Sequence, residues 1–406
     1  MNNRPLKIML LPPPVLPVPA VQGGAIETLI TLLAQENERQ QQVVFYVPSR
    51  PDVQAKKQAQ SFRYTHFIYI EPQPLRQKVS LNALRYSIAD HLSQLVCHSE
   101  LAIGPYYWRA FRLAKSLGCD YIIAEGGDYP FFSTFIEEFG PDRVYLHLHH
   151  DCTDLPNLNH IFSHVICVSE FLRRAWLSNA TSSSGSAHVV HNAIDLSMFQ
   201  RRISTEERQQ LRQEYGFSEQ DTVAVFCGRL IPVKGVLELV QAFQLLNHPS
   251  LRLWIIGTPN FKTAATSDYA ARLEQLAAHS GGHIRMTGYV DNCDLYRYYQ
   301  SSDFQVVPSL WEEAAGLVAI EGMASGLPII ATRSGGLVEY VDTSCALLAD
   351  RGPGLVTDLA HAMETLTTDT DLRNRMSLAA RKRAEEFSSA KMYQAFLNVF
   401  RTEEIL

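Results

Sequence analysis

Short apolar runs rich in β-branched residues alternate along the chain with longer segments whose apolar positions recur every three or four residues. Such runs, bounded by turn residues, predict buried parallel strands, and the segments between them predict crossover helices. Six strands are predicted in the first half: Lys7–Leu11, Val43–Val47, Tyr121–Ala124, Val144–His149, Val165–Val168 and His188–Val190. Helices are expected to begin near Ala25, Tyr107, Tyr129 and Glu170. The pattern therefore predicts an α/β domain.

The second half repeats this pattern after a polar stretch that runs from Gln200 to Asp221. Its predicted strands are Thr222–Cys227, Arg252–Ile256, Ile284–Thr287, Phe304–Val307 and Pro328–Thr332. Its predicted helices start at Gly235, cover Asp268–Ala278 and start at Leu317, and residues 355–400 are almost entirely helix-forming. We expect a second α/β domain that ends in helices.

The chain length agrees with two domains, because 406 residues exceed the ~250 at which single hydrophobic cores usually stop growing. We place the first domain at residues 1–198, the second at residues 199–385 and a terminal helix at residues 386–406. Ligands in open parallel sheets bind beyond the carboxyl ends of the strands. Chemistry is therefore expected in the loops that follow the strands.

Composition narrows the classes of partner. A net charge of −6 without a long basic run argues against nucleic acid. The seven cysteines form no C-x-x-C pair, which favours a reduced, cytoplasmic setting over a zinc framework. The apolar run Ile8–Leu11 is ended by three prolines, and no segment reaches the ~18 apolar residues of a membrane span. Peripheral membrane contact stays open.

A loop that leads from a predicted strand into a predicted helix carries the strongest motif, from Ser309 to Pro328. Gly316 stands where the helix would begin, and the free N–H groups of a helix N-terminus bind phosphate. Glu321, one turn further on, suits a ribose diol, and Glu313 in the loop suits sugar hydroxyls. Apolar neighbours on both sides of Glu321 argue against a purely solvated role for its carboxylate.

A second motif, Gly228-Arg229 followed by Lys234-Gly235, stands after the first strand of the same domain. Two cations in a glycine-flanked turn can neutralise a diphosphate, since arginine forks two oxygens and lysine acts as a point charge. Alone, the string is typical of a surface turn. Together with the glutamate motif, it indicates a site for a diphosphate.

Histidines gather at the end of the predicted strand Val144–His149. Strand alternation places His147 and His149 on the same face, and His150 follows them. A lone histidine is usually structural, but three within four positions at a strand end favour function. The string His-Leu-His-His-Asp from His147 to Asp151 also resembles a metal-binding sequence, so that alternative stays open.

These motifs resemble those of the family 4 retaining glycosyltransferases of GT-B fold, also called glycosyltransferases group 1. The resemblance rests on the spacing of Glu313 and Glu321 and on the string around Arg229 and Lys234. Supporting matches spread over the whole chain: Gly23-Gly24-Ala-Ile-Glu27, Val168-Ser169-Glu170, Asn192-Ala-Ile-Asp195 and Gly335-Gly336. The segment Pro17–Glu27 and the string Leu146–His149 are similar to spore-coat-type members.

The resemblance implies two Rossmann-like domains that face each other across a cleft, with a C-terminal helix that crosses back to the N-terminal domain. It implies that residues 1–198 bind the acceptor, residues 199–385 bind a nucleotide-diphosphate sugar, and the sugar is transferred with retention and without a metal or other cofactor. His149, Arg229, Lys234 and Glu313 are the implied catalytic residues. The implied donor contacts are Gly23, Gly24, Gly228, Arg229, Lys234, Tyr289, Val290, Glu313, Ala315, Gly316, Leu317, Val318 and Glu321.

Two departures from the family pattern concern the details of the site. Ala315 stands where Phe or Tyr is common, and Ala193 stands where Gly is common, which leaves the sugar open. We favour a UDP-sugar as donor of a hexose or N-acetylhexosamine, with a glycan, lipid-linked, protein or small-molecule acceptor. The alternatives are a UDP-sugar epimerase of GT-B fold and a catalytically silent coat or scaffold protein.

Overall fold

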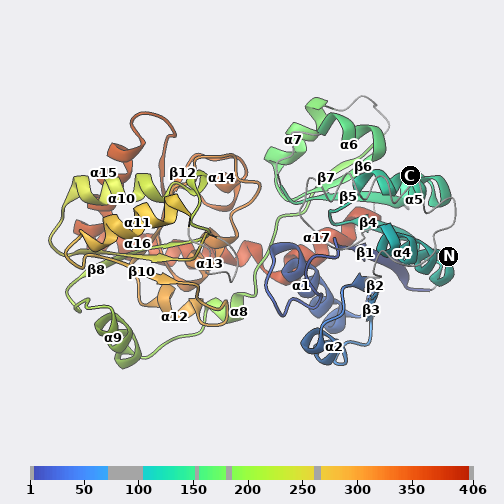
Figure 1. The fold of residues 1–406 in the computed structure, drawn as a ribbon, viewed down its shortest axis with the longest axis horizontal. Coiled ribbons are helices and arrows are strands. Elements are labelled where there is room, and N and C mark those ends of the chain that lie inside the picture. The colour runs from blue at the N-terminus through green and yellow to red at the C-terminus, as the bar shows by residue number, and fades with distance from the viewer. Residues whose placement is uncertain (1–3, 72–103, 151–154, 180–184, 260–266, 402–406) are drawn as a thin grey trace. The chain divides into compact units, whose positions relative to one another are not determined.

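The computed structural model describes residues 4–71, 104–150, 155–179, 185–259 and 267–401 (Figure 1). The chain divides into two compact units. The first comprises residues 1–168, 172–190 and 393–406, and the second comprises residues 169–171 and 191–392. The chain passes into the main part of the second unit after residue 190, whereas the sequence prediction placed this boundary after residue 198. Each unit is described by itself below.

The first unit contains a seven-stranded sheet in the order β3-β2-β1-β4-β5-β6-β7, with every pair parallel. Its strands are β1 (Leu6–Leu11), β2 (Val43–Ser49), β3 (Thr65–Tyr69), β4 (Tyr121–Ala124), β5 (Val144–Leu148), β6 (His164–Cys167) and β7 (Ala187–Val189). Its helices are α1 (Ala25–Gln40), α2 (Val53–Ala59), α4 (Gly104–Leu117), α5 (Phe132–Phe139), α6 (Leu155–Ile161), most of α7 (Glu170–Asn179), most of α17 (Ser389–Arg401) and the short 3-10 helices η1 (Tyr129–Phe131) and η2 (Pro141–Arg143).

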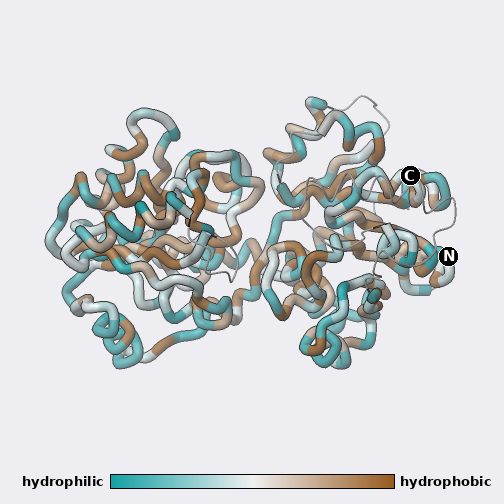
Figure 2. The backbone as a smooth tube through the Cα atoms, viewed as in Figure 1, coloured by the Kyte–Doolittle hydropathy of each residue, from teal (hydrophilic) through white to brown (hydrophobic). Residues whose placement is uncertain are grey.

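Most residues of the central strands β1, β4 and β5 are apolar and buried, as expected when helices cover both faces of a parallel sheet (Figure 2). The end of α17 packs on one face, where the rings of Tyr393 and Phe396 contact Phe45 of β2. The Tyr393 hydroxyl also donates to Oδ1 of Asn37 in α1, at 2.7 Å. Residues from the end of the chain therefore complete the core of the first unit.

The second unit contains a six-stranded parallel sheet in the order β10-β9-β8-β11-β12-β13. Its strands are β8 (Thr222–Cys227), β9 (Leu251–Ile256), β10 (Ile284–Gly288), β11 (Phe304–Val307), β12 (Ile329–Thr332) and β13 (Ala346–Ala349). Its helices are α8 (Leu196–Phe199), α9 (Thr205–Glu214), α10 (Val236–Leu246), α11 (Asp268–Ala278), α12 (Leu295–Gln300), α13 (Leu317–Ser325), α14 (Leu337–Tyr340), α15 (Leu355–Thr368), α16 (Thr370–Ala384) and the 3-10 helices η3 (Pro232–Lys234) and η4 (Glu385–Phe387).

Both sheets follow the doubly wound order 3-2-1-4-5-6, extended by β7 in the first unit. In this order the chain reverses direction of winding between β1 and β4 in the first unit, and between β8 and β11 in the second. Ligands bind at such switch points, in the crevice outside the carboxyl ends of the strands. The motif loops after β8 and β11 stand at the switch point of the second unit.

The structure confirms the prediction of two parallel α/β domains and corrects some details. The prediction of six strands in the first half was one too few, because β3 was missed. The helix expected to begin near Tyr107 begins at Gly104. Among the described residues, no helix is long and apolar enough to span a membrane.

Candidate functional site

Gly235 brings the two motif loops of the second unit together. It adopts a left-handed conformation, with φ of 69°, between η3 and α10. A Cβ atom at this position would lie 1.9 Å from the carbonyl oxygen of Pro308, at the end of β11. Only glycine fits this approach, so the loop after β8 can lie directly against the loop after β11.

Lys234 and Glu313 form an ion pair where these loops meet. The Lys234 Nζ donates to Oε1 of Glu313 at 2.6 Å, and the Ser309 hydroxyl donates to the same oxygen at 2.5 Å. The ammonium also lies 4.9 Å from the centroid of the Trp311 ring. The structure thus pairs one predicted cation with one predicted carboxylate, and adds two neighbours, Ser309 and Trp311, whose contacts the sequence did not indicate.

The turn at Gly335-Gly336 fixes the course of the Glu313 loop. The N–H of Gly336 donates to the carbonyl of Glu313 at 2.6 Å, and the N–H of Glu313 donates to the hydroxyl of Ser334 at 3.1 Å. A Cβ atom on Gly336 would lie 2.3 Å from the carbonyl oxygen of Ala314. The glycine pair therefore allows the two loops to pack closely enough to exchange these hydrogen bonds.

Helix α13 begins at Leu317, with Gly316 as its N-cap and without a side chain that caps its first amides. A Cβ atom at Gly316 would lie 2.6 Å from Cδ1 of Leu337, so packing against α14 favours glycine here. The positive end of the helix dipole and the uncapped amides make this N-terminus suited to an anion. This is where the sequence predicted that a helix would begin.

Glu321 lies one turn further along α13. The hydroxyl of Tyr299, in α12, donates to its Oε2 at 3.0 Å. Burial raises the pKa of Glu321 to about 7, and the hydrogen bond from Tyr299 offsets part of that rise. Near neutral pH this carboxyl group therefore exists in both protonation states.

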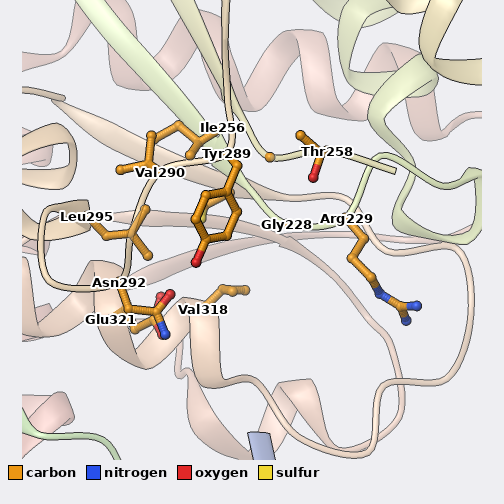
Figure 3. A pocket seen from close by; sticks show the side chains of 12 residues that line it. Gly228, Arg229, Ile256, Thr258, Tyr289, Val290, Asn292, Leu295, Val318 and Glu321 are labelled. Atoms are coloured by element: carbon orange, nitrogen blue, oxygen red, sulfur yellow. The ribbon is translucent and has the colours of Figure 1, made fainter. Parts of the chain in front are cut away.

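A pocket opens above Glu321 at the carboxyl ends of the strands (Figure 3). Its lining includes these predicted site residues: Gly228, Arg229, Tyr289, Val290, Val318 and Glu321. It also includes residues that were not predicted: Cys227, Ile256, Gly257, Thr258, Asn292 and Leu295. Figure 3 shows the Tyr289 ring over the space next to Glu321, with the Arg229 guanidinium to one side. Lys234, Glu313 and Ala315–Leu317 are outside this lining.

The unpredicted lining residues follow from the topology. Ile256 ends β9, and Thr258 comes two residues later, so both reach the edge of the sheet where Arg229 lies. Asn292 follows β10 in the same way. Their position directly after β9 and β10 is the signal that the sequence offers for them, because ligands bind beyond the carboxyl ends of parallel strands.

The first unit has a polar cluster at the carboxyl ends of β4 and β5. The register of β4 and β5 pairs Ala124 with Leu146, which brings Glu125 level with His147. Oε2 of Glu125 lies 2.9 Å from Nδ1 of His147 and 2.7 Å from Nε2 of His149. The three side chains are 1%, 4% and 7% exposed, so water does not screen their interactions.

Burial and charge set the protonation of this cluster. Burial alone would raise the pKa of Glu125, but the charges and hydrogen bonds of His147 and His149 lower it to about 2. Burial, together with the charge of His147, lowers the pKa of His149 to about 4, against the opposing influence of Glu125. At neutral pH Glu125 is therefore a carboxylate and His149 is uncharged.

The same trio concerns the question of a metal ion. In the part of the chain that the structure describes, it is the one group of three or more histidine, cysteine or acidic residues whose ligand atoms lie within 4.8 Å of one another. Asp151, which completes the predicted metal-binding string, lies outside the described residues. His150 is exposed and is not a member of the trio.

Gly23 and Gly24 precede α1, with φ values of 86° and 96°. A Cβ atom on Gly24 would lie 2.1 Å from Oε2 of Glu27, whose buried carboxyl group has a raised pKa because of that burial. The two glycines are thus required by the local backbone. Their predicted contact with a donor, like the sugar contact of His149, stays a prediction.

Comparisons with known proteins agree with this geometry. Residues 207–383 match the family model described as glycosyl transferases group 1. The chain is 24% identical to spore coat protein SA of Bacillus subtilis (strain 168) over 416 residues, which cover 97% of the chain and 99% of the relative.

Solved structures resemble the chain along nearly its whole length. A glycosyltransferase from Rickettsia africae superposes with a TM-score of 0.76 at 18% identity, covering 98% of both chains. Anabaena Alr3699/HepE, in complex with UDP-glucose, superposes with a TM-score of 0.72 at 21% identity, covering 98% of this chain and 100% of the other. The fold is that of the GT-B glycosyltransferases. Residues 207–383, which carry both motif loops, match the glycosyltransferase group 1 family, and the protein is a glycosyltransferase.

Proposed function

We propose that this glycosyltransferase moves a hexose or N-acetylhexosamine from a UDP-sugar to an acceptor hydroxyl, with retention of configuration and without a metal ion. The observation that carries the proposal is the order of groups in the second unit. An open pocket with a half-buried carboxyl group adjoins an uncapped helix N-terminus, and a lysine–glutamate pair stands in the neighbouring loop. These groups suit, in turn, a nucleoside, a diphosphate and a sugar.

The pocket above Glu321 suits the nucleoside. Tyr289, Val290 and Leu295 offer an aromatic and apolar lining for a base. Glu321 projects into the same space, where a carboxylate can accept hydrogen bonds from both hydroxyls of a ribose. Tyr299 holds one of its oxygens and so restrains the side chain for this contact.

The diphosphate is proposed to bind between the cations and α13. Arg229 lines the pocket, and Lys234 reaches the neighbouring loop. Together with the amides near Gly316 and Val318 they offer positive charge where the leaving group gains negative charge, which is the most effective place for electrostatic stabilisation. These groups can supply the charge neutralisation that a metal ion supplies in other enzymes.

Glu313 is proposed to hold the sugar. Its Oε1 is already engaged by Lys234 and Ser309, which leaves Oε2 to accept from sugar hydroxyls. The acceptor hydroxyl would attack the anomeric carbon from the face of the leaving group. As its oxygen bonds to that carbon, the bond from the carbon to the phosphate oxygen breaks, and the hydroxyl proton passes to a donor phosphate oxygen. His149 is proposed to contact the transferred sugar.

The choice of UDP draws on a structural relative, since Alr3699/HepE is described in complex with UDP-glucose. The test is to incubate the full-length protein with α-configured UDP-glucose or UDP-GlcNAc and a panel of acceptor sugars, with GDP-mannose as the comparison donor. We expect UDP release from a UDP-sugar that continues in EDTA, and an α-linked product by NMR. A β-linked product would contradict retention, and abolition by EDTA would contradict metal independence.

The same assay separates the alternatives. A UDP-sugar that is epimerised without any acceptor would favour the epimerase. A complete lack of transfer and of slow hydrolysis with every common donor would favour the catalytically silent coat or scaffold protein.

A further inference from the structure

Glu125 binds two histidines through a single oxygen. Oε2 faces Nδ1 of His147 at 2.9 Å and Nε2 of His149 at 2.7 Å, and the two rings lie with centroids 4.0 Å apart. Both contacts have the length of charge-assisted hydrogen bonds. The arrangement depends on the parallel register of β4 and β5, and not on mobile surface side chains.

The positions of the protons follow from the chemistry of these groups. An ionised carboxylate only accepts hydrogen bonds, so each ring nitrogen that faces Oε2 must carry a hydrogen. An uncharged imidazole has one N–H, and its other nitrogen is then a bare acceptor. For His149 the hydrogen stands on Nε2, and the bare acceptor is Nδ1.

That acceptor is buried and unpartnered. Among the described residues, Nδ1 of His149 and Nε2 of His147 have no hydrogen-bond partner. A buried acceptor without a donor is unfavourable, and a ligand hydroxyl that donates to it would remove the cost. The unpartnered Nδ1 of His149 therefore indicates that a ligand with a hydrogen-bond donor binds here, and this indication does not depend on the sequence resemblance.

We propose that Glu125 is a positioning residue, which locks His149 in its Nε2–H tautomer so that Nδ1 accepts a hydrogen bond from a hydroxyl of the transferred sugar. The inference rests on the proposed function, in which His149 contacts that sugar. It adds the identity of the contacting atom, its role as acceptor and the residue that sets both.

A metal ion on the same trio is less consistent with the contacts. A metal-binding histidine usually donates its second N–H to a carboxylate, carbonyl or water. In the described part of the chain, the second ring nitrogens of His147 and His149 have no such acceptor. The separations of 2.7 and 2.9 Å are instead those of direct hydrogen bonds.

The test is nitrogen NMR of the full-length protein with 15N-labelled histidine at pH 7.5, with the His149 signals assigned from the His149→Gln variant. We expect wild-type His149 to be protonated at Nε2 and bare at Nδ1. In Glu125→Leu, neither ring keeps the carboxylate oxygen as its acceptor, so the preference of His149 for the Nε2–H tautomer should be lost. Glu137→Leu, which makes the same chemical change at an exposed site on α5, should leave both tautomers unchanged.

Kinetics with a UDP-sugar gives the second measurement. Glu125→Leu should lower kcat by about 100-fold, as expected when one preorganised contact is lost, with the KM for donor changed less than about threefold. Glu125→Asp keeps the carboxylate and should restore the wild-type tautomer and part of kcat.

Three outcomes would overturn the inference: wild-type His149 protonated at Nδ1, an unchanged tautomer of His149 in Glu125→Leu, or one equivalent of added Zn²⁺ bound at the two ring nitrogens. The wild-type spectrum decides even if the variants fail to fold. If the predicted tautomer is found but no donor is turned over, the proposed function fails while the assignment of Glu125 to His149 stands.

Discussion

Both units place polar side chains at the carboxyl ends of neighbouring strands, but the chemistry of the two groups differs. In the second unit the loops after β8 and β11 bring together a cation, a carboxylate and an uncapped helix N-terminus. In the first unit the loops after β4 and β5 bring one carboxylate between two buried histidines. The doubly wound sheet decides where a site can form, and the residues after each strand decide what it can bind.

The two units also use charge in different ways. Lys234 and Glu313 keep 21% and 12% of their side chains exposed, and their pair can open to a charged ligand. The trio around Glu125 is almost fully buried, and its charge is used internally to fix two rings. The Lys234–Glu313 pair is suited to bind an anion, whereas the Glu125 trio is suited to hold an uncharged histidine ring in one orientation, with one nitrogen free to accept a hydrogen bond.

The largest effect is expected from Lys234→Ala, because the second unit is proposed to supply the positive charge that stabilises the departing diphosphate. Loss of this ammonium should lower the rate of sugar transfer at least about 100-fold. Lys382→Ala, at an exposed position on α16, is the control and should retain full activity. Near-normal turnover by Lys234→Ala would contradict the assignment of this charge to the second unit.

Variants of Glu321 and His149 test whether the second unit binds the donor nucleotide while the first unit contacts only the sugar. Glu321→Ala should lower transfer about 100-fold and weaken the thermal stabilisation by UDP, which amounts to about 2.7 kcal/mol when UDP is at 100 times its dissociation constant. His149→Ala should lower transfer but keep the UDP stabilisation of the wild type, since the histidine belongs to the first unit. Equal loss of UDP stabilisation in both variants would contradict the assignment.

The pH dependence of donor binding tests Glu321 more finely. Its pKa is raised to about 7, so it is mostly protonated at pH 6 and mostly ionised at pH 8. If the ionised form binds the ribose, the dissociation constant for UDP should fall about tenfold between these values. In Glu321→Gln that slope should disappear, and an unchanged slope would assign the titration to another group.

Ionisation of Glu321 at higher pH should strengthen UDP binding but weaken the folded state. A carboxyl group whose pKa is raised in the folded state favours folding at low pH, and this contribution is lost as the pH rises through the folded pKa of about 7. The melting temperature of Glu321→Gln relative to the wild type should therefore increase from pH 6 to pH 8.5. This measurement requires no ligand.

The smallest change concerns the backbone that holds the second site. Gly235→Ala should destabilise the protein by more than about 1 kcal/mol, because a Cβ atom would lie 1.9 Å from the carbonyl of Pro308. Gly281→Ala is the matched control, since Gly281 has a φ of 63° and open space around it. Denaturant unfolding of both variants isolates the close approach, and equal losses of stability would contradict it.

Much of the fold could be predicted where burial is complete. The limits of β8 and α11 agree with the sequence prediction residue for residue, because an all-apolar strand and an amphipathic helix give clear periodic signals. The strand β3 lies at the edge of its sheet, and most of its residues are only half-buried. Its mixed sequence, Thr-His-Phe-Ile-Tyr, therefore resembles a loop.

The candidate sites divide in the same way. Glu313, Glu321, Arg229 and Lys234 could be predicted because their spacing within two short motifs is itself informative. The link between Glu125 and His149 spans 24 positions and depends on which strands are neighbours in the sheet. Sequence periodicity predicts strand ends, but the pairing of strands that joins these ends is a tertiary property.

The position of α17 has a consequence for the order of synthesis. Domains fold as units, beginning at the N-terminus while the chain is still being made. The sheet of the first unit is complete after β7, yet Phe45 and Tyr145 stay without the rings of Tyr393, Phe396 and Phe400 until these residues have been synthesised. The first unit can therefore complete its core only after the second unit has been made.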